Sequence, residues 1–423
     1  MAYLPRVIDG VLDDLLPHLP AIAIEGARGV GKTATAQRRA ERVIDLTQGE
    51  QRAIIEAKPD LAVSGPGTTL IDEWQLVPEV WDRVRAAVDV DPTGGRFLLT
   101  GSAWPSRQVR IHSGAGRIAR LTLRPLSFPE RGLARPTVSL TQLLAGDARA
   151  IEGESGIDLT AYTEEITASG FPGLRNLPER PRRVQLDSYL DRAVDRDLPE
   201  NGTQVRRPSA LRAWLAAYGG ATSTTSSYTT ILEAATSGSA NKASRQTLDG
   251  YREALERQFL LDPLPAWEPA LSPLRRLALA PKHHLVDPAL AARLAQVDAP
   301  ALLRGEGRVV APGAAPFLGA LFESLVAQTV RVLAAAAFAR TFHLRTKGGE
   351  HEVDLIVEAD DGRVVAIEVK LNPVVTAKDV AHLLWLRRTI SDRLADLVVV
   401  TTGRQAHRRP DGVAVVPLAL LGV

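Results

Sequence analysis

The sequence predicts an α/β protein built around a mostly parallel sheet with helices on both faces. Three observations predict this class. A short apolar run, AIAI at residues 21–24, leads into a glycine-rich turn and then into the helix-favouring TATAQRRAERV at 33–43. Two further apolar runs, at 68–71 and 97–100, flank a helix-like segment at 78–90. Because strands and helices alternate, we expect parallel strands whose carboxyl ends form a ligand site at one edge.

The glycine-rich turn matches the pattern G-x-x-x-x-G-K-[ST], which predicts a site for a nucleoside triphosphate. Its glycines let the backbone curl so that successive N–H groups point at phosphate oxygens, and the following helix adds its positive dipole end. Lys32 supplies a charge at the β- and γ-phosphates, and the Thr33 hydroxyl is a ligand for Mg²⁺. A glycine-rich turn with an incidental lysine is the alternative, which the flanking strand and helix disfavour. The predicted phosphate-binding residues are Gly26, Ala27, Arg28, Gly29, Val30, Gly31, Lys32, Thr33 and Ala34.

The next apolar run, TTLIDEWQ at 68–75, ends in two adjacent carboxylates. This is typical of the second element of a P-loop ATPase, in which Asp72 holds Mg²⁺ through water and Glu73 polarises the attacking water. The strand RFLLTGSA at 96–103 ends in polar residues. Thr100 or Ser102 is predicted to sense the γ-phosphate, and a hydroxyl that merely caps the strand is the alternative. We therefore expect ATP and Mg²⁺ as ligands of this part of the chain.

Longer stretches give the sequence a family resemblance. TTLIDEWQLVPEVWDRVR, FLLTGSA, SGAGRIARLTLRPLSFPE, ASGFPGL and SYLDRAVDRDL resemble a prokaryotic family of AAA-type ATPases. In that family the ATPase is joined to a C-terminal domain of unknown function that ends in a PD-(D/E)xK nuclease-like fold. The resemblance implies that Arg117 senses phosphate in its own subunit or acts as an arginine finger toward a neighbour. A surface arginine with neither role is the alternative. The resemblance also implies a homo-oligomer.

Residues 1–150 are predicted to form the ATPase core and residues 151–206 a helical lid on it. Residues 207–268 contain three helical segments followed by strand-like LLDPLPAWEP, which is the order of a winged helix. A recognition helix would then begin near Ser244, with its leading side chains meeting phosphates or base edges. A winged helix that only packs against the ATPase or a neighbour is the alternative. The predicted DNA-contacting residues here are Lys242, Arg245, Gln246 and Thr247.

Residues 269–423 are predicted to form the nuclease-like domain, with a second chemical site. Alternation places Glu368 and Lys370 on one face of a strand. Asp354 lies on the preceding strand-like run, and Glu323 lies in an apolar helix. The three carboxylates are predicted to bind Mg²⁺ or Mn²⁺, and the lysine to orient the nucleophile or neutralise the oxyanion. Ordinary amphipathic strands are the alternative. Arg345 and Lys347 are predicted to hold a nucleic-acid backbone.

Composition limits the remaining possibilities. The 423 residues suffice for several domains, and 45% apolar residues suffice for buried cores. The chain has no cysteine, so thiolate metal sites and disulfides are excluded. The N-terminal MAYLPRVIDG has no secretion-signal pattern, and no apolar run is judged long enough to cross a membrane. We expect a cytoplasmic protein. A net charge of +2 does not by itself indicate a nucleic-acid partner.

The sequence leaves three functions open. The first is an ATP-hydrolysing AAA-type ATPase that acts on DNA, including branched or single-stranded DNA, through its winged-helix and nuclease-like domains. The second is an ATP-gated regulatory or signalling switch whose C-terminal domain is catalytically inert. The third is an ATP-controlled, metal-dependent DNA endonuclease.

Overall fold

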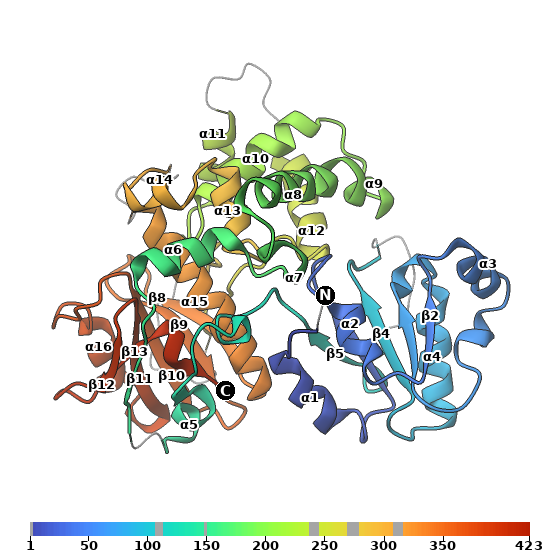
Figure 1. Cartoon of the computed structure of the whole chain (residues 1–423), viewed down its shortest axis with the longest axis horizontal. Coiled ribbons are helices and arrows are strands. Elements are labelled where there is room, and N and C mark those ends of the chain that lie inside the picture. Colours follow the sequence, from blue (N-terminus) through green and yellow to red (C-terminus); the bar gives the residue numbers. More distant parts are fainter. Residues whose placement is uncertain (1–2, 106–112, 148–149, 237–244, 269–278, 308–315) are drawn as a thin grey trace.

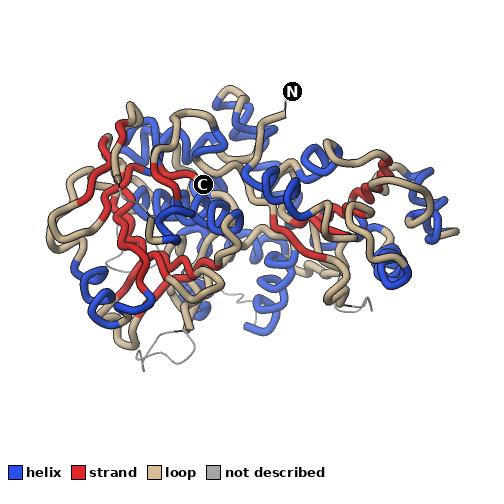
Figure 2. Tube along the Cα trace, turned by 90° about the horizontal axis from the view of Figure 1, so that it is seen from below, coloured by secondary structure: helices blue, strands red, loops and turns tan. Residues whose placement is uncertain are grey.

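The protein divides into three structural units, which we call the N-terminal, helical and C-terminal domains (Figure 1). The computed structural model describes residues 3–105, 113–147, 150–236, 245–268, 279–307 and 316–423. The N-terminal domain comprises residues 3–131. The helical domain lies between residues 172 and 303. The C-terminal domain combines residues 136–168 with residues 316–423. Figure 2 shows the sheets of the N-terminal and C-terminal domains at opposite ends of the molecule.

The N-terminal domain has a five-stranded sheet whose paired strands all run parallel, in the order β2-β3-β4-β1-β5. Strands β1 and β4 are buried throughout, so helices cover both faces as the alternating pattern predicts. The elements are α1 (Val7–Leu15), β1 (Ala21–Glu25), α2 (Lys32–Gln37), β2 (Arg42–Asp45), α3 (Gly49–Ala57), η1 (Pro59–Ala62), β3 (Thr69–Asp72), η2 (Trp74–Leu76), α4 (Glu79–Val90), β4 (Phe97–Gly101), β5 (Ala119–Thr122) and η3 (Pro129–Arg131).

The helical domain follows. Its elements are α7 (Pro172–Arg175), α8 (Glu179–Arg192), the π-helix η4 (Ala193–Asp197), α9 (Leu198–Glu200), α10 (Pro208–Gly220), α11 (Tyr228–Thr236), α12 (Arg245–Arg257), α13 (Pro288–Leu294) and α14 (Ala299–Leu303). The three helices predicted in residues 207–265 are confirmed as α10, α11 and α12. The strand-like residues after α12 pair antiparallel at Leu261 with Leu285 and at Leu264 with Lys282, and Ala266 then bridges to His343 of the C-terminal domain. The winged-helix assignment itself stays a prediction.

The C-terminal domain has a mixed seven-stranded sheet in the order β7-β12-β13-β11-β10-β9-β8. Its elements are β6 (Val138–Ser139), α5 (Leu140–Ala145), β7 (Gly153–Glu154), α6 (Leu159–Ala168), α15 (Phe317–Ala336), β8 (Arg340–Arg345), β9 (Glu352–Glu358), β10 (Val364–Lys370), α16 (Ala381–Thr389), η5 (Ser391–Arg393), β11 (Leu394–Thr401), β12 (Gln405–Arg408), β13 (Ala414–Pro417), η6 (Leu418–Leu420) and β14 (Leu421–Gly422).

The predicted boundary at residue 150 is wrong, because residues 138–154 pair with the C-terminal domain, whereas α6 also packs against α13 and α14 of the helical domain. Strand β6 pairs with β14, and β7 pairs with β12 at the edge of the C-terminal sheet. The Tyr162 hydroxyl on α6 accepts the N–H of Ala419 at 2.9 Å. The chain therefore passes from the N-terminal domain into the C-terminal domain before it enters the helical domain. Two-residue strands carry no periodicity, so no sequence pattern predicts these long-range pairs.

Helix α15 lies at the centre of the largest hydrophobic core, where it contacts α1, α6, α13 and the strands β8 to β10. Among the described residues, α15 alone is long and apolar enough to cross a membrane, with 20 residues and a mean hydropathy of 1.4. The expectation that no stretch reaches that length is therefore wrong. However, 72% of the apolar window is buried inside the molecule, which is typical of a core helix.

Candidate nucleotide-binding site

The loop between β1 and α2 has the shape that its glycines require. Gly26 has φ 151°, and a β-carbon there would lie 2.1 Å from the carbonyl oxygen of Leu123. Gly31 has φ 100° and caps the amino end of α2. The N–H groups of residues 27–31 donate no hydrogen bond to any described residue. Unpaired N–H groups at a helix amino end form a ready site for an anion, so this loop fits the phosphates of a nucleotide.

Lys32 lies inside the loop that precedes it. Its Nζ donates to the carbonyl oxygens of Gly26 at 2.9 Å and Ala27 at 3.0 Å, and the residue is 4% exposed. Burial lowers the pKa of Lys32 to about 8, against the opposing attraction of Glu73 and Asp72. Two neutral carbonyl oxygens compensate the charge of a buried ammonium poorly. A phosphate bound nearby would therefore stabilise the charged form of Lys32.

Three strands and a helix bring the predicted Mg²⁺ ligands together. Strand β4 lies between β1 and β3, so Thr100 at its end sits between the glycine-rich loop and Asp72. The Thr33 hydroxyl on α2 donates to Oδ1 of Asp72 at 2.8 Å, and the Thr100 hydroxyl donates to the same oxygen. Burial raises the pKa of Asp72 above its ordinary value, while these two hydrogen bonds act in the opposite direction. Hydroxyl and carboxylate oxygens are ligands that Mg²⁺ prefers, so the donor set fits this ion.

Glu73 is held in an unusual backbone conformation. It has φ 55° and ψ 48°, in the left-handed region that non-glycine residues rarely adopt. Its carboxylate accepts hydrogen bonds from Ser102 Oγ at 2.6 Å and from Gln75 Nε2. Its N–H donates to Thr100 Oγ1 at 3.3 Å. Such conformations cost about 1–3 kcal/mol and cluster at functional sites, which agrees with the predicted role of Glu73. Sequence reasoning missed Gln75, although its position two residues after Glu73 could have indicated that it lies near that carboxylate.

The helical domain reaches over the glycine-rich loop. Phe171, which precedes α7, and Pro172, its first residue, lie against Gly29 and Gly31 respectively, at 3.8 and 3.9 Å from where a β-carbon would stand. At the far end of α8, the π-helix η4 presents Asp197. That carboxylate pairs with Arg28 of the loop at 3.2 Å and with Arg192 of α8 at 3.1 Å. Two separate segments of the helical domain therefore contact the loop that is predicted to bind phosphate.

A buried arginine, Arg6, also holds the glycine-rich loop in place. Arg6 forms an ion pair with Glu130 at 3.1 Å, and both side chains are almost fully buried. Its guanidinium also donates to the carbonyl oxygens of Val30 at 2.8 Å and Arg124 at 2.7 Å. Arg6 thus fixes the glycine-rich loop to the start of α1 and to the end of β5. Sequence reasoning missed this residue because its partner lies 124 positions away.

Arg117 is not near the loop. It precedes β5, so it lies at the edge where the parallel strands begin, whereas the loop follows β1 at the edge where they end. The length of a five-residue strand, about 15 Å, separates the two edges. Arg117 pairs instead with Asp89 of α4 at 2.8 Å. The arrangement offers no support for a phosphate sensor in the same subunit, and a role toward a neighbouring subunit stays a prediction.

The predicted metal site of the C-terminal domain is not assembled. Glu323 lies on α15, Asp354 on β9, and Glu368 with Lys370 on β10. However, the described residues contain no group of three or more His, Asp or Glu residues that could hold a metal ion. The ammonium of Lys282 instead contacts Glu323 Oε1 at 2.8 Å and Asp354 Oδ1 at 3.0 Å. The metal assignment therefore stays a prediction, which the described residues do not support. Lys282 was missed because it belongs to a different stretch of the sequence.

The carboxylates of this cluster have unusual proton affinities. Burial raises the pKa of both Glu323 and Glu368 to about 8. Glu368 pairs with Lys370 at 2.7 Å, and its other oxygen is buried without a partner. The pKa of Asp354 lies below its ordinary value because Lys282 and Lys370 outweigh its burial.

The residues predicted to contact DNA do not form one surface in the described structure. Lys242 and the side chain of Arg245 lie outside the described residues, and Gln246 is exposed on the first turn of α12. Arg345 is paired with Glu352 at 3.3 Å, and Lys347 is exposed in the turn between β8 and β9.

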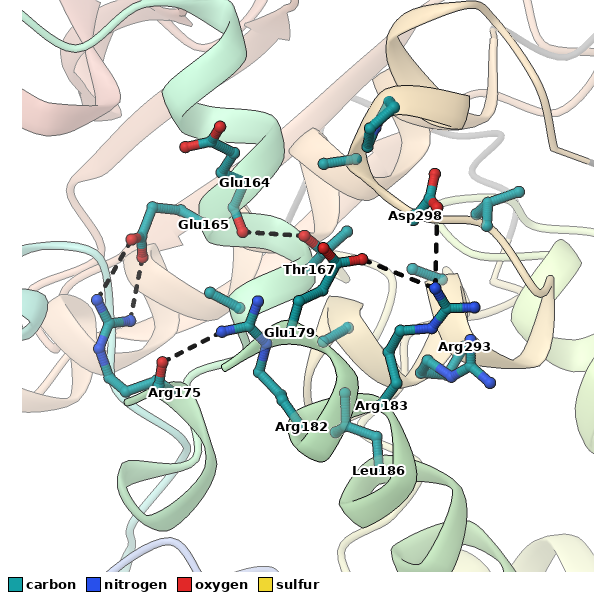
Figure 3. A pocket seen from close by; sticks show the side chains of 16 residues that line it. Glu164, Glu165, Thr167, Arg175, Glu179, Arg182, Arg183, Leu186, Arg293 and Asp298 are labelled. Carbon is teal, nitrogen blue, oxygen red and sulfur yellow. Dashed lines mark hydrogen bonds and ion pairs between the residues drawn. The ribbon is translucent and has the colours of Figure 1, made fainter. Parts of the chain in front are cut away.

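A separate cavity of about 420 Å³ lies between α6, α8, α13 and α14 (Figure 3). Arg175 pairs with Glu165 at 3.0 Å on one side of it, and Arg183 lies 3.9 Å from Asp298 on the other. Acidic and basic groups alternate around its wall, so the lining does not select an anion or a cation.

Three family models match the sequence. An AAA domain matches residues 18–131, a domain of unknown function (DUF8612) matches 159–301, and a second domain of unknown function (DUF4143) matches 318–421. The chain therefore carries an AAA-type domain followed by a C-terminal domain of unknown function, as the resemblance implied. The AAA domain supports a nucleotide-binding ATPase that takes ATP, usually with Mg²⁺.

Two mycobacterial relatives are similar over nearly the whole chain. The uncharacterized proteins Rv2008c of Mycobacterium tuberculosis and Mb2031c of Mycobacterium bovis are each 26% identical over 411 residues, covering 95% of this chain and 81% of theirs. Among solved structures, Drosophila ORC bound to DNA overlaps 60% of this chain and 86% of its own, with 11% identity and a TM-score of 0.22. At that TM-score the overlap carries no argument about fold or function.

Proposed function

We propose that this protein is an ATP-hydrolysing AAA-type ATPase that acts on nucleic acid through its helical and C-terminal domains. One observation carries the ATPase part. The hydroxyl of Thr33 meets Asp72 at 2.8 Å directly beside a loop of unpaired N–H groups. A Mg²⁺ ion held there would bridge and neutralise the phosphate oxygens. Lys32 binds the terminal phosphates, and Glu73 orients the attacking water.

The contacts of the helical domain support a link between nucleotide state and domain position. Arg28 belongs to the phosphate-binding loop, yet it pairs with Asp197 of η4. The γ-phosphate competes with Asp197 for this guanidinium, because arginine prefers the more highly charged oxyanion. Loss of that ion pair releases the contact between η4 and the loop, while Phe171 keeps its place against Gly29. Nucleotide binding therefore changes the position of α8 relative to the N-terminal domain.

Nucleic acid is the proposed partner on chemical grounds. The first turn of α12 exposes Gln246, and Lys347 projects from the turn between β8 and β9 without a carboxylate partner among the described residues. Polar amides read base edges, and lysines bind phosphates. Arg117, at the opposite edge of the sheet from the loop, is proposed to act toward a neighbouring subunit of a homo-oligomer.

A second function, an ATP-gated switch with an inert C-terminal domain, is favoured by one specific observation. Lys282 pairs with Glu323 and Asp354, which were the expected metal ligands. In this case ATP controls contacts between proteins, and DNA has no effect on hydrolysis. We do not carry the endonuclease forward, because its ligand set is not assembled among the described residues.

ATP hydrolysis measured with and without single-stranded, duplex and branched DNA separates the two functions. We expect hydrolysis to rise with at least one of these DNAs, and Lys347→Glu to weaken DNA retention at low salt. Lys378→Glu is the matched control, because Lys378 is also an exposed lysine of the C-terminal domain. Hydrolysis without DNA stimulation or retention refutes the nucleic-acid part and leaves the switch. The absence of hydrolysis under all conditions refutes the ATPase itself.

A further inference from the structure

A lysine ammonium occupies the centre of the carboxylate cluster in the C-terminal domain. Lys282 Nζ lies 2.8 Å from Glu323 Oε1, 3.0 Å from Asp354 Oδ1 and 3.2 Å from Glu352 Oε1. The Lys282 side chain is 1% exposed. The three oxygens come from α15 and β9, so one cation joins two elements of the domain. A buried cation with three carboxylate partners is an unusual arrangement, because burial of an ammonium is costly unless its charge is compensated.

The backbone fixes Lys282 in this position. Its N–H donates to the carbonyl of Leu264 at 2.9 Å, and its own carbonyl accepts the N–H of Leu264 at the same distance. The neighbouring His283 is tied in the same way, since its N–H donates to Thr224 O at 2.9 Å. The short antiparallel pair of residues 261–264 with 282–285 therefore positions the Lys282 ammonium in the cluster. This pair lies outside the seven-stranded sheet.

Two further carboxylate oxygens near Lys282 already have partners, whereas Glu368 Oε2 is buried without a partner among the described residues. Asp354 Oδ2 accepts the N–H of Val369 at 2.9 Å, and Glu368 Oε1 accepts Lys370 Nζ at 2.7 Å. Divalent cations such as Mg²⁺ and Mn²⁺ need about six oxygen ligands at close to 2 Å. An ion in contact with Glu323 and Asp354 would also meet the positive charge of Lys282 at close range.

We propose that Lys282, which comes from the helical domain, is a built-in cation for the carboxylate cluster of the C-terminal domain, taking the place of a divalent metal among Glu323, Asp354 and Glu352. The domain then folds and acts without a metal ion, as a binding or assembly module. Removal of the lysine leaves three buried carboxylates without their shared counter-charge, so we expect a divalent cation to enter the space that the ammonium leaves. The proposal is independent of the ATPase function, because it concerns a site in a different domain and is tested without nucleotide.

The test is Mn²⁺ binding to the full chain in the absence of nucleotide, measured by electron paramagnetic resonance of the free ion. All proteins carry Asp72→Asn, so that the nucleotide site does not contribute. We expect the Lys282→Ala protein to bind about one Mn²⁺ with a Kd on the order of 10⁻⁴ M, the range of weak carboxylate sites. The parent and Lys378→Ala, the matched loss of an exposed lysine, should show at least tenfold weaker binding.

Either of two results obtained with folded proteins overturns the proposal. One is a folded Lys282→Ala protein that binds Mn²⁺ no better than the parent. The other is Mn²⁺ binding by the parent that Asp354→Asn abolishes, because the lysine would then not replace a metal. If Lys282→Ala does not fold without metal, addition of Mn²⁺ during refolding should restore it, and Lys282→Met repeats the test with less loss of volume. Failure of Mn²⁺ to rescue either variant also contradicts the proposal.

Discussion

Replacement of Lys32 by methionine should stabilise the protein in the absence of nucleotide, although it removes the central charge of the phosphate site. The ammonium is buried inside the glycine-rich loop, where it donates hydrogen bonds to two carbonyl oxygens. Methionine has nearly the same length and no charge to desolvate. The substitution therefore removes the cost of burying the charge while it keeps most of the packing.

The pKa of Lys32 sets the size of this effect. Burial lowers that pKa from its ordinary value of 10.5 to about 8, which corresponds to about 3 kcal/mol against the charged, folded state. The two hydrogen bonds to carbonyl oxygens are lost with the ammonium and offset part of this gain. We therefore expect Lys32→Met to raise the free energy of unfolding by about 1–2 kcal/mol at pH 7, or the midpoint by about 2–8 °C.

The direction of the pKa shift of Lys32 determines how the stability difference between Lys32→Met and the parent depends on pH. Below about pH 8 the lysine is protonated in both folded and unfolded chains, so the full cost of burial is present. Between about pH 8 and 10.5 the folded protein loses this proton before the unfolded chain does, and the cost disappears. The advantage of the methionine variant should therefore be largest at pH 7 and vanish toward pH 10.

Thermal unfolding followed by differential scanning fluorimetry at pH 7, 8, 9 and 10 measures this difference without nucleotide. Lys58→Met is the matched control, because Lys58 is an exposed lysine of the same domain and should change nothing. A methionine variant that is less stable than the parent at pH 7, or whose advantage does not change with pH, refutes the assignment of Lys32 as a strained, phosphate-seeking cation.

Four further substitutions test the surrounding residues. Asp72→Asn should remove the Mg²⁺ dependence of ATP binding, whereas Glu73→Gln should keep binding but lower turnover about 10²–10⁴-fold, as seen by comparing titration with steady-state hydrolysis. Arg6→Met should destabilise the N-terminal domain by about 3–5 kcal/mol in chemical denaturation, because the buried carboxylate of Glu130 loses its partner. Arg196 is exposed, so Arg196→Met is the control and should cause no measurable change. Asp197→Asn should raise ATP affinity up to about fivefold, since a partly exposed ion pair is worth at most about 1 kcal/mol, and a decrease in affinity contradicts the proposed competition.

The nucleotide site was predictable because its signals are local. The glycine-rich loop and the carboxylate pair are each contiguous in the sequence, and their strands are strongly apolar, so pattern and chemistry agree there. The parallel sheet then brings Thr33, Asp72 and Thr100 together without further information, because the carboxyl ends of its strands share one edge. The structure brings these three residues together and adds Gln75 and Arg6, whereas their roles toward a nucleotide stay predictions.

The chemistry of the second site was not predictable, because its residues are not close together in the sequence. Glu323, Asp354 and Glu368 match a metal-binding pattern, but the residue that decides their chemistry, Lys282, lies 41 and 72 positions from its first two partners. Side-chain charge alone does not tell whether a distant lysine will be buried among carboxylates. The two-residue strands β6 and β7 show the same limit at the level of the fold, since only long-range pairing defines them.

The central claim is that the loop at residues 26–33 binds ATP and that the bound nucleotide is hydrolysed. Calorimetric titration of Mg²⁺–ATP into the parent and Lys32→Ala proteins, combined with phosphate release from the same samples, tests it most directly. We predict binding and steady release of phosphate by the parent, and loss of both in the variant. Equal affinity of the two proteins for ATP would contradict the claim that the loop at residues 26–33 binds the nucleotide.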